Sequence, residues 1–180
     1  MGFFLESLRH FGTVGTVIPS SQIVAKKITN PVNFNEAKII VELGGGTGAI
    51  TKEILANMRR DAELVVFETN PPFAKALKAL NDPRLTVVNN SAIKLGDYLK
   101  SRSIKNVDFI ISTLPLAVMS KRTTAKILEE VVNALAVRGR YVQIQYSLVS
   151  KKEIEKKFSV VKLDFTPLNF PPAFFYICER

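Results

Sequence analysis

Strand-like and helix-like segments alternate along this 180-residue chain from residue 36 to its end. The strand-like segments are short runs rich in β-branched residues, at 38–43, 63–68, 84–88, 107–112, 140–146, 160–165 and 174–178. The spacing of apolar residues predicts helices at 49–60, 73–80, 121–136 and 151–158. Gly139 is expected to end the helix at 121–136. Strands separated by helices of this length predict an α/β fold with a mostly parallel sheet, completed by the last two strands as a closing pair.

A glycine-rich turn follows the first strand. The sequence from Glu42 to Gly48 reads E-L-G-G-G-T-G, and a helix-like segment begins directly after it. Glycines in a strand-to-helix turn let a ligand approach the backbone, because no Cβ atom stands in the way. Ligands of parallel sheets bind at the carboxyl ends of the strands, which is where this turn lies. A P-loop is excluded, because no Gly-Lys-Ser/Thr follows.

Two carboxylates indicate what this turn binds. Glu68 ends the second strand, where a carboxylate can accept hydrogen bonds from both hydroxyls of a ribose. Glu42 stands two residues before Gly44, where its charge would repel the pyrophosphate of a dinucleotide and attract a cationic ligand. S-adenosylmethionine carries an ammonium and a sulfonium and has no phosphate. The pattern E-x-G-x-G-x-G therefore favours S-adenosylmethionine, with a plain structural turn as the alternative.

These motifs resemble those of the class I S-adenosylmethionine-dependent methyltransferases over residues 36–180. The resemblance implies a Rossmann-like seven-stranded sheet with a reversed last strand and helices on both faces. It also implies a cofactor site made of Glu42, Gly44, Gly46 and Gly48 around the methionine part, with Glu68, Thr69, Ser91, Ala92 and Ser112 around the rest. Ser91 occupies the place where the class often has an Asp facing the adenine amine, so it can hydrogen-bond there without bringing a charge.

The loop after the fourth strand, Ser112-Thr113-Leu114-Pro115-Leu116, is expected to receive the methyl acceptor. The ribosomal RNA adenine dimethylases carry Asn-Leu-Pro-Tyr/Phe there, where the aromatic ring stacks on the base and the amide holds its amine. In this chain Thr113 replaces the amide and Leu116 replaces the aromatic residue. These differences count against a nucleic-acid base as the acceptor, although the Leu-Pro core is shared.

Three stretches are similar to the bacterial phospholipid N-methyltransferases, which methylate phosphatidylethanolamine. They are residues 11–21 (FGTVGTVIPSS), the loop at 112–116 and residues 169–173 (NFPPA), and Gln143 and Tyr146 match that family as well. The resemblance implies an S-adenosylmethionine-dependent N-methyltransferase acting on the amine headgroup of a phospholipid at the membrane surface. The alternatives are a nucleic-acid adenine N6-methyltransferase acting on rRNA and a binding module without activity.

Residues in and beside the acceptor loop are expected to do the chemistry. Methyl transfer needs a nitrogen lone pair in line with the methyl group, so an ammonium must first lose a proton. Tyr146 and the backbone carbonyls of Thr113 and Leu114 are expected to orient the amine while water takes the proton. Tyr146 as a buried structural residue is an equal alternative. The residues expected to bind the substrate are Ser20, Ser21, Pro115, Leu116, Lys121 and Arg122.

Residues 1–35 stand outside the alternation and are expected to form an amphipathic helical segment that acts as a lid for membrane or substrate. One side of a helical wheel is covered by apolar residues, namely Phe3, Phe4, Leu5, Leu8 and Phe11. Such a helix can lie in an anionic membrane surface, or it can pack on the sheet. A second helix is expected at 20–28, where Lys26 and Lys27 could meet lipid phosphate.

The amino-acid composition indicates which partners the protein can bind and in which cellular compartment it is expected. A hydrophobic fraction of 47% with 23% charged residues is that of a globular domain. The net charge of +9 attracts anions such as acidic lipid headgroups or nucleic acid. A single cysteine, Cys178, allows no internal disulfide and is typical of a reducing compartment. No metal-ligand spacing, membrane span or secretory signal is found. The expected location is therefore cytoplasmic, at the inner face of the membrane.

Overall fold

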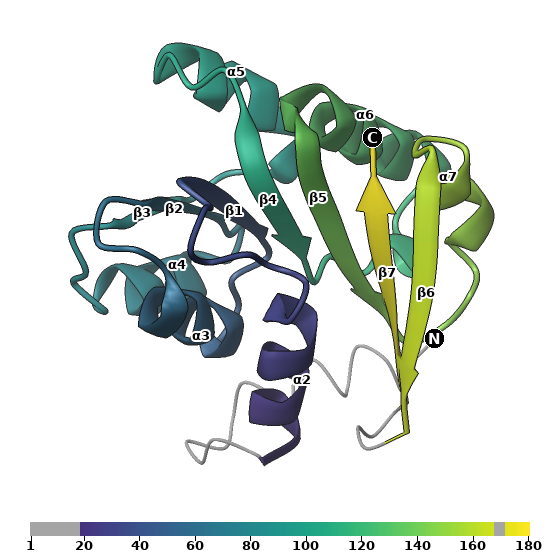
Figure 1. The fold of residues 1–180 in the computed structure, drawn as a ribbon, viewed down its shortest axis with the longest axis horizontal. Helices are drawn as coiled ribbons and strands as arrows, with labels where there is room; N and C mark the ends of the chain where they lie inside the picture. The colour runs from purple at the N-terminus through teal and green to yellow at the C-terminus, as the bar shows by residue number, and fades with distance from the viewer. Residues whose placement is uncertain (1–18, 168–171) are drawn as a thin grey trace.

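The computed structural model describes residues 19–167 and 172–180. A seven-stranded sheet of strand order β3-β2-β1-β4-β5-β7-β6 runs through them (Figure 1). The strands are β1 (Ile39–Leu43), β2 (Glu63–Phe67), β3 (Leu85–Val88), β4 (Val107–Ser112), β5 (Leu135–Gln145), β6 (Val160–Thr166) and β7 (Ala173–Glu179). The first five strands pair in parallel, and β7 lies antiparallel between β5 and β6. This confirms the sheet and the reversed last strand expected from the sequence.

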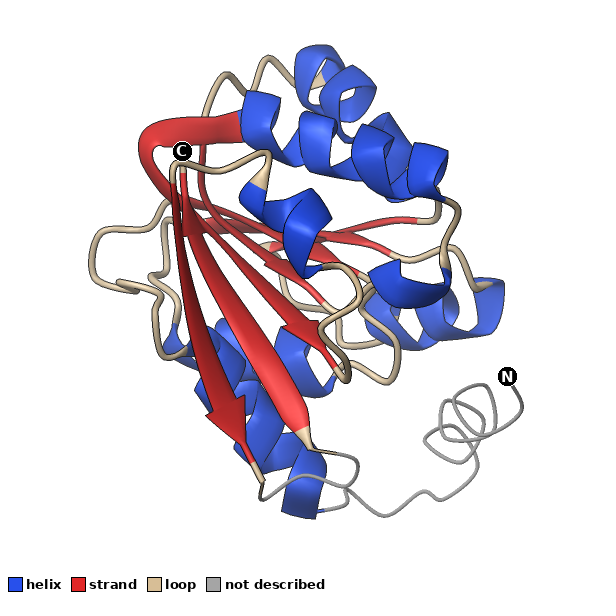
Figure 2. Ribbon diagram, turned by 90° about the vertical axis from the view of Figure 1, so that its right-hand side faces the viewer, coloured by secondary structure: helices blue, strands red, loops and turns tan. Residues whose placement is uncertain are grey.

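Helices cover both faces of the sheet, as Figure 2 shows in blue against the red strands. They are α2 (Pro19–Thr29), α3 (Ala49–Asn57), α4 (Pro71–Lys78), α5 (Leu95–Ser101), α6 (Lys121–Ala134) and α7 (Lys151–Glu155), with short 3-10 turns η1 (Ala92–Lys94) and η2 (Leu116–Val118). Successive strand residues point to opposite faces and so enter two separate cores. Val41 and Val65 pack in the core of α5, α6 and α7, while Ile40 and Leu64 pack in the core of α2, α3 and α4.

The helix and strand around Gly139 correct one expectation. The helix expected at 121–136 ends at Ala134, and β5 begins directly at Leu135. Gly139 therefore lies inside the strand, where the pairing of β5 with β4 changes register, and does not close the helix. A Cβ atom at this position would lie 2.8 Å from the carbonyl oxygen of Val107, so the close approach of the two strands requires glycine.

Three elements were not expected from the sequence, namely the short turn η2 after β4 and two elements between β3 and β4. The short turn η1 and the seven-residue helix α5 occupy the connection between β3 and β4. The helix buries only Leu95 and Leu99, which is too short a pattern to establish a helical period.

The helix α2 belongs to the body of the domain. Within the segment expected to stand apart at 1–35, Val24, Ala25 and Ile28 are buried in the same core as Ile40 of β1. Residues 1–18, including the expected N-terminal amphipathic helix, lie outside the described residues, as do 168–171 of the stretch at 169–173. In the part of the chain that the structure describes, no helix is long and apolar enough to cross a bilayer.

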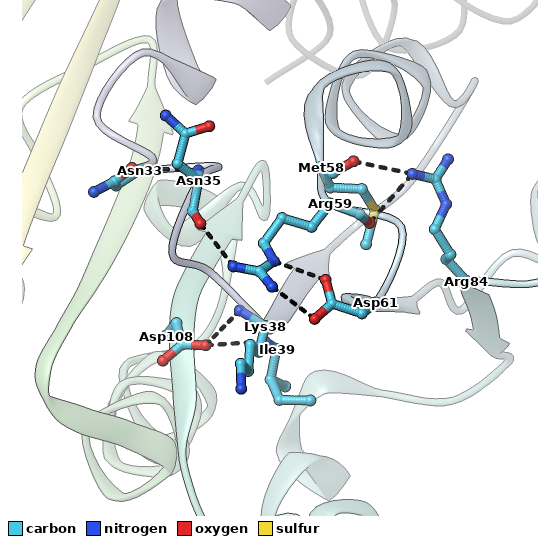
Figure 3. A network of polar contacts seen from close by, with 9 residues as sticks. All are labelled: Asn33, Asn35, Lys38, Ile39, Met58, Arg59, Asp61, Arg84 and Asp108. Carbon is cyan, nitrogen blue, oxygen red and sulfur yellow. Dashed lines mark hydrogen bonds and ion pairs between the residues drawn. The ribbon is translucent and has the colours of Figure 1, made fainter.

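The amino ends of the parallel strands are joined by polar contacts, shown in Figure 3. Asp108 at the start of β4 accepts hydrogen bonds from the backbone N–H groups of Lys38 and Ile39, at 2.8 and 2.9 Å. Arg59 forms a two-pronged ion pair with Asp61, each contact being 2.7 Å long. Asp108, Arg59 and Asp61 all bond to other groups of the protein. The polar side chains at this edge of the sheet therefore stabilise the fold.

Candidate active site

The glycine turn links β1 to α3 at the carboxyl edge of the sheet. Gly44, Gly46 and Gly48 have φ angles of 87°, 51° and 81°, a region that favours glycine. A Cβ atom on Gly44 would lie 2.8 Å from Oγ1 of Thr113, so the turn touches the acceptor loop. A Cβ atom on Gly46 would meet no atom within 4 Å, which leaves space beside the backbone for a ligand.

Glu42 is a buried carboxylate with one unused oxygen. Its Oε2 accepts a hydrogen bond of 2.6 Å from the hydroxyl of Thr51, while Oε1 is buried and has no hydrogen-bond partner. Burial, together with a smaller effect of the nearby charge of Glu68, raises the pKa of Glu42 to about 8, although the hydrogen bond from Thr51 acts to lower it. A buried carboxylate oxygen without a partner is costly, and a cationic group would satisfy it. The ammonium of S-adenosylmethionine fits this requirement.

Glu68 ties the glycine turn to the end of β2. Its two oxygens accept hydrogen bonds from the backbone N–H groups of Gly46 (2.9 Å) and Asn70 (2.7 Å). An ionised carboxylate has about four acceptor sites, so two remain for the hydroxyls of a ribose. The side chain is 8% exposed, which limits competition from water. These contacts fit the ribose-binding role expected from the sequence.

The strand end at Ser91 lies next along the sheet. The Ser91 hydroxyl accepts a long hydrogen bond of 3.4 Å from the N–H of Ile93 and caps the turn η1. Asn89 donates from its side-chain amide to the backbone oxygen of Glu68 (2.7 Å), which joins this strand end to the ribose side of the site. Ala92 is buried behind Ser91. Ser91 therefore has a structural role in the fold, and its contact with adenine stays a prediction.

Two buried amides fix the acceptor loop after β4. The carbonyl oxygen of Leu114 accepts hydrogen bonds from Nε2 of Gln143 (3.0 Å) and Nε2 of Gln145 (2.8 Å). Both lone pairs of this oxygen are thus engaged, so Leu114 is not available to orient an acceptor amine in the way its sequence position had indicated. Leu114 instead anchors the loop to β5.

Thr113 connects the same loop to the glycine turn. Its hydroxyl donates a hydrogen bond of 2.7 Å to the carbonyl oxygen of Gly44. The lone pairs of Oγ1 then remain as acceptors on a half-buried side chain. The structure therefore brings the expected acceptor loop and the expected cofactor turn into direct contact.

The other expected site residues differ in their surroundings. Ser112 is fully buried and accepts from the N–H of Leu114 (3.3 Å), which places its side chain beneath the loop. Leu116 is 3% exposed, and Tyr146 is half-buried directly after β5. Thr69, Lys121 and Arg122 are exposed, and Pro115 is half-buried. Ser20 and Ser21 lie in the first turn of α2, and their side chains fall outside what the structure describes.

Sequence reasoning missed the roles of Gln145 and Thr51. Gln145 is 3% exposed and Thr51 is fully buried, and each bonds to a residue of the site. A signal was available for Gln145, because Gln143 and Gln145 are polar residues two apart in a segment whose neighbouring residues, Val142 and Ile144, are apolar. Thr51 carried no such signal, since a threonine in the first turn of a helix is common.

Lys27 corrects an expectation about lipid contact. Its Nζ lies 3.2 Å from Asp164 and donates to the backbone oxygen of Phe165 at 2.9 Å. This lysine is therefore used to hold α2 against β6, while Lys26 is exposed. Among the described residues no three His, Cys, Asp or Glu side chains lie close enough together to hold a metal ion.

Solved structures with this fold define the class. An N-methyltransferase, NodS from Bradyrhizobium japonicum, solved in complex with S-adenosyl-L-homocysteine, superposes with a TM-score of 0.75, at 11% identity over 96% of each chain. A TehB-like S-adenosylmethionine-dependent methyltransferase from Corynebacterium glutamicum gives a TM-score of 0.66 at 15% identity, over 98% of this chain and 96% of that one. The fold is that of the S-adenosylmethionine-dependent methyltransferases.

Sequence comparison gives the family within that class. The family model of the ribosomal RNA adenine dimethylases matches residues 15–164. An ornithine lipid N-methyltransferase from Singulisphaera acidiphila is 31% identical over 98% of this chain and 95% of its own length. The chain belongs to the ribosomal RNA adenine dimethylase family and is an S-adenosylmethionine-dependent N-methyltransferase.

A ribosomal RNA relative matches over less of its length. The ribosomal RNA small subunit methyltransferase A from Thermotoga petrophila is 25% identical over 86% of this chain and 62% of that protein. The chain therefore spans somewhat less than two thirds of this relative.

Proposed function

We propose that this enzyme methylates the primary amine of a lipid headgroup, of the phosphatidylethanolamine type, at a membrane surface. The observation that carries the proposal is the acceptor loop. The Thr113 hydroxyl is engaged with Gly44, and Leu116 is 3% exposed, so the loop offers neither a side-chain amide nor an aromatic ring to an extruded adenine. A small aliphatic amine needs neither of these groups.

The similarity to the ornithine lipid N-methyltransferase supports the same class of acceptor. That match extends over nearly the full length of both chains. Ornithine lipid and phosphatidylethanolamine share one chemistry, a primary amine on an amphiphile. The test below therefore includes both lipids.

The residues of the site have separate tasks in this reaction. S-adenosylmethionine, when bound, supplies a methyl group on a positively charged sulfur. Glu42 would hold its ammonium and Glu68 its ribose, and the glycine turn would leave room for both. On the acceptor side, Oγ1 of Thr113 would accept an N–H of the amine and direct the nitrogen lone pair toward the cofactor. Tyr146, directly after β5, is the second group proposed to orient the amine.

Loss of the acceptor proton does not require a strong base from the chain. Among the described residues of the acceptor loop and of the strand end at Tyr146, no carboxylate or histidine is present. Water at the open side of the loop is the proposed proton acceptor. The rate is then expected to rise with pH as the free-amine form of the acceptor becomes more abundant.

The experiment is methyl transfer from radiolabelled S-adenosylmethionine in three parallel reactions. These contain vesicles with phosphatidylethanolamine, vesicles with ornithine lipid, or ribosomal RNA. Label is expected in at least one lipid extract and not in RNA. The Glu68→Ala variant should lose the signal, and Asp61→Ala, at the opposite edge of the sheet, should retain it. Label in RNA alone would contradict the proposal.

An adenine N6-methyltransferase acting on rRNA is the second candidate. The family match and the net charge of +9 favour it, because a basic surface attracts the phosphate backbone. The RNA reaction of the same experiment tests it directly.

A further inference from the structure

Four large apolar side chains are exposed at the carboxyl edge of the sheet, which also holds the acceptor loop. Val118 ends η2 and is 56% exposed; Leu148 and Val149, 45% and 70% exposed, follow β5. Phe165, near the end of β6, is 46% exposed. Since β5 and β6 both lie antiparallel to β7, they run in the same direction and end at the same edge.

Contacts join these side chains to the acceptor loop. The N–H of Ala117 donates to Oε1 of Gln145 at 3.4 Å, so η2 lies beside the end of β5. Gln145 pairs with Phe174, and Phe174 pairs with Phe165, which places the three side chains in one row on one face. The rings of Phe165 and Phe174 are 5.1 Å apart. Two aromatic side chains therefore continue the row from Gln145, beside the acceptor loop, to the exposed edge strand.

Positive charges border this surface. Lys121 and Arg122 lie in the first turn of α6, and Lys152 lies in the first turn of α7, so all three are at the carboxyl edge. All three are exposed, and no ion pair engages them within residues 19–167 and 172–180. The dipole of α6 opposes cations in its first turn, so helix stability does not explain the position of Lys121 and Arg122.

We propose that Val118, Leu148, Val149 and Phe165 form a membrane-docking surface, here called the carboxyl-edge surface, that seats the enzyme on an anionic bilayer. The apolar side chains would enter the interface, and the bordering cations would meet lipid phosphates. This inference rests on the proposed function, because a lipid amine reaches the acceptor loop only if this edge faces the bilayer. It differs from the contact expected of the N-terminal helix, since residues of η2, of β6 and of the segment after β5 form it.

Vesicle binding of two matched double variants tests the surface. Leu148→Glu with Val149→Glu adds two negative charges at the carboxyl edge. Val137→Glu with Val160→Glu adds the same charges at the amino edge, where these valines are 89% and 40% exposed. The vesicles contain equal parts of phosphatidylglycerol and phosphatidylcholine, which offer no primary amine, so binding is measured apart from catalysis. The first pair should weaken binding about tenfold or more, and the second by much less.

The outcomes separate this inference from the proposed function. Equal losses for both pairs, or no loss for either, would overturn the carboxyl-edge surface even if lipid in detergent micelles is methylated. A wild-type enzyme that binds RNA oligonucleotides but not these vesicles would also overturn it. If vesicle binding falls only for the first pair while methyl label appears only in RNA, the surface stands and the proposed lipid acceptor fails. Circular dichroism and thermal melting of both variants check that the fold is retained.

Discussion

Carboxylates at the two edges of this sheet have opposite environments. At the amino edge, Asp61 and Asp82 each pair with an arginine two residues away, and hydrogen bonds from that arginine lower the pKa of both carboxyls. At the carboxyl edge, burial raises the pKa of Glu42, and one of its oxygens has no partner. Each carboxylate oxygen of Glu68 accepts one backbone hydrogen bond and can accept another.

The difference separates residues that stabilise the fold from residues reserved for a ligand. A carboxylate whose partners lie within the protein contributes to stability in every state of the enzyme. A buried carboxylate oxygen without a partner destabilises the free protein and gains an interaction only when a cationic ligand arrives. Substitutions at the amino edge should therefore change stability, and those at the carboxyl edge should change binding.

The largest effect is expected for Glu68→Ala. This change removes the acceptor proposed for both ribose hydroxyls and releases the N–H of Gly46 from its partner. Two hydrogen bonds to a charged group are lost, so the affinity for S-adenosylmethionine should fall about 100-fold or more. Isothermal titration calorimetry measures it, with Asp61→Ala as the matched control of unchanged affinity. An unaltered affinity in Glu68→Ala would remove the ribose role.

Asp108→Ala should have the converse effect. The backbone N–H groups of Lys38 and Ile39 lose their shared acceptor at the start of β1, which should reduce the free energy of unfolding by about 1–3 kcal/mol. Cofactor affinity should stay that of the wild type at a temperature where both are folded. Urea denaturation gives the stability, and Asp108→Asn, which keeps an acceptor oxygen, should lose less. A large fall in affinity would show that the two edges are not separable.

Glu42→Gln tests the raised pKa. The folded protein holds a proton on Glu42 between the ordinary pKa of 4.5 and about 8, while the unfolded chain does not. The stability of the cofactor-free wild type should therefore fall as pH rises through this window, by up to about 1.4 kcal/mol per pH unit. Glu42→Gln should flatten this dependence and weaken cofactor binding about tenfold.

Proton release gives an independent measurement on Glu42. At pH 7 the wild type should release a proton when the cationic cofactor binds, because the ammonium favours the carboxylate form. Calorimetry in two buffers of different ionisation enthalpy detects that proton. Release of equal size in Glu42→Gln would assign the proton to another group.

The centre of the sheet could be predicted from the sequence because β1, β2 and β4 are buried on both faces. Runs such as 38–43 and 107–112 contain three or more consecutive apolar residues, which is typical of central parallel strands. The start of β5 could not be predicted, because Gly139 is read as a helix end by local rules, and only the approach of Val107 reveals its place in a strand. The helix α5 was missed because seven residues carry too little periodicity.

The site was predictable where spacing along one segment fixes geometry. Glu42 and the glycines belong to one strand-turn-helix unit, and Glu68 follows from the end of the next strand. The anchoring of Leu114 by Gln143 and Gln145 was not predictable, because it joins residues 29 and 31 positions apart across two strands. The hydrogen bond from Thr113 to Gly44 was not predictable for the same reason, because these residues are 69 positions apart along the chain.

The smallest effect is expected for Arg59→Ala. This variant tests whether the exposed ion pairs of the amino edge contribute to stability. The side chains of Arg59 and Asp61 are 39% and 57% exposed, so water and salt screen their ion pair in spite of its short contacts. Removing Arg59 should leave the melting temperature nearly unchanged, whereas Asp108→Ala should lower it, because Asp108 accepts hydrogen bonds from two backbone N–H groups at the start of β1. Melting at low and high salt makes the comparison. A loss as large as that of Asp108→Ala would mean that exposed pairs, too, hold this edge together.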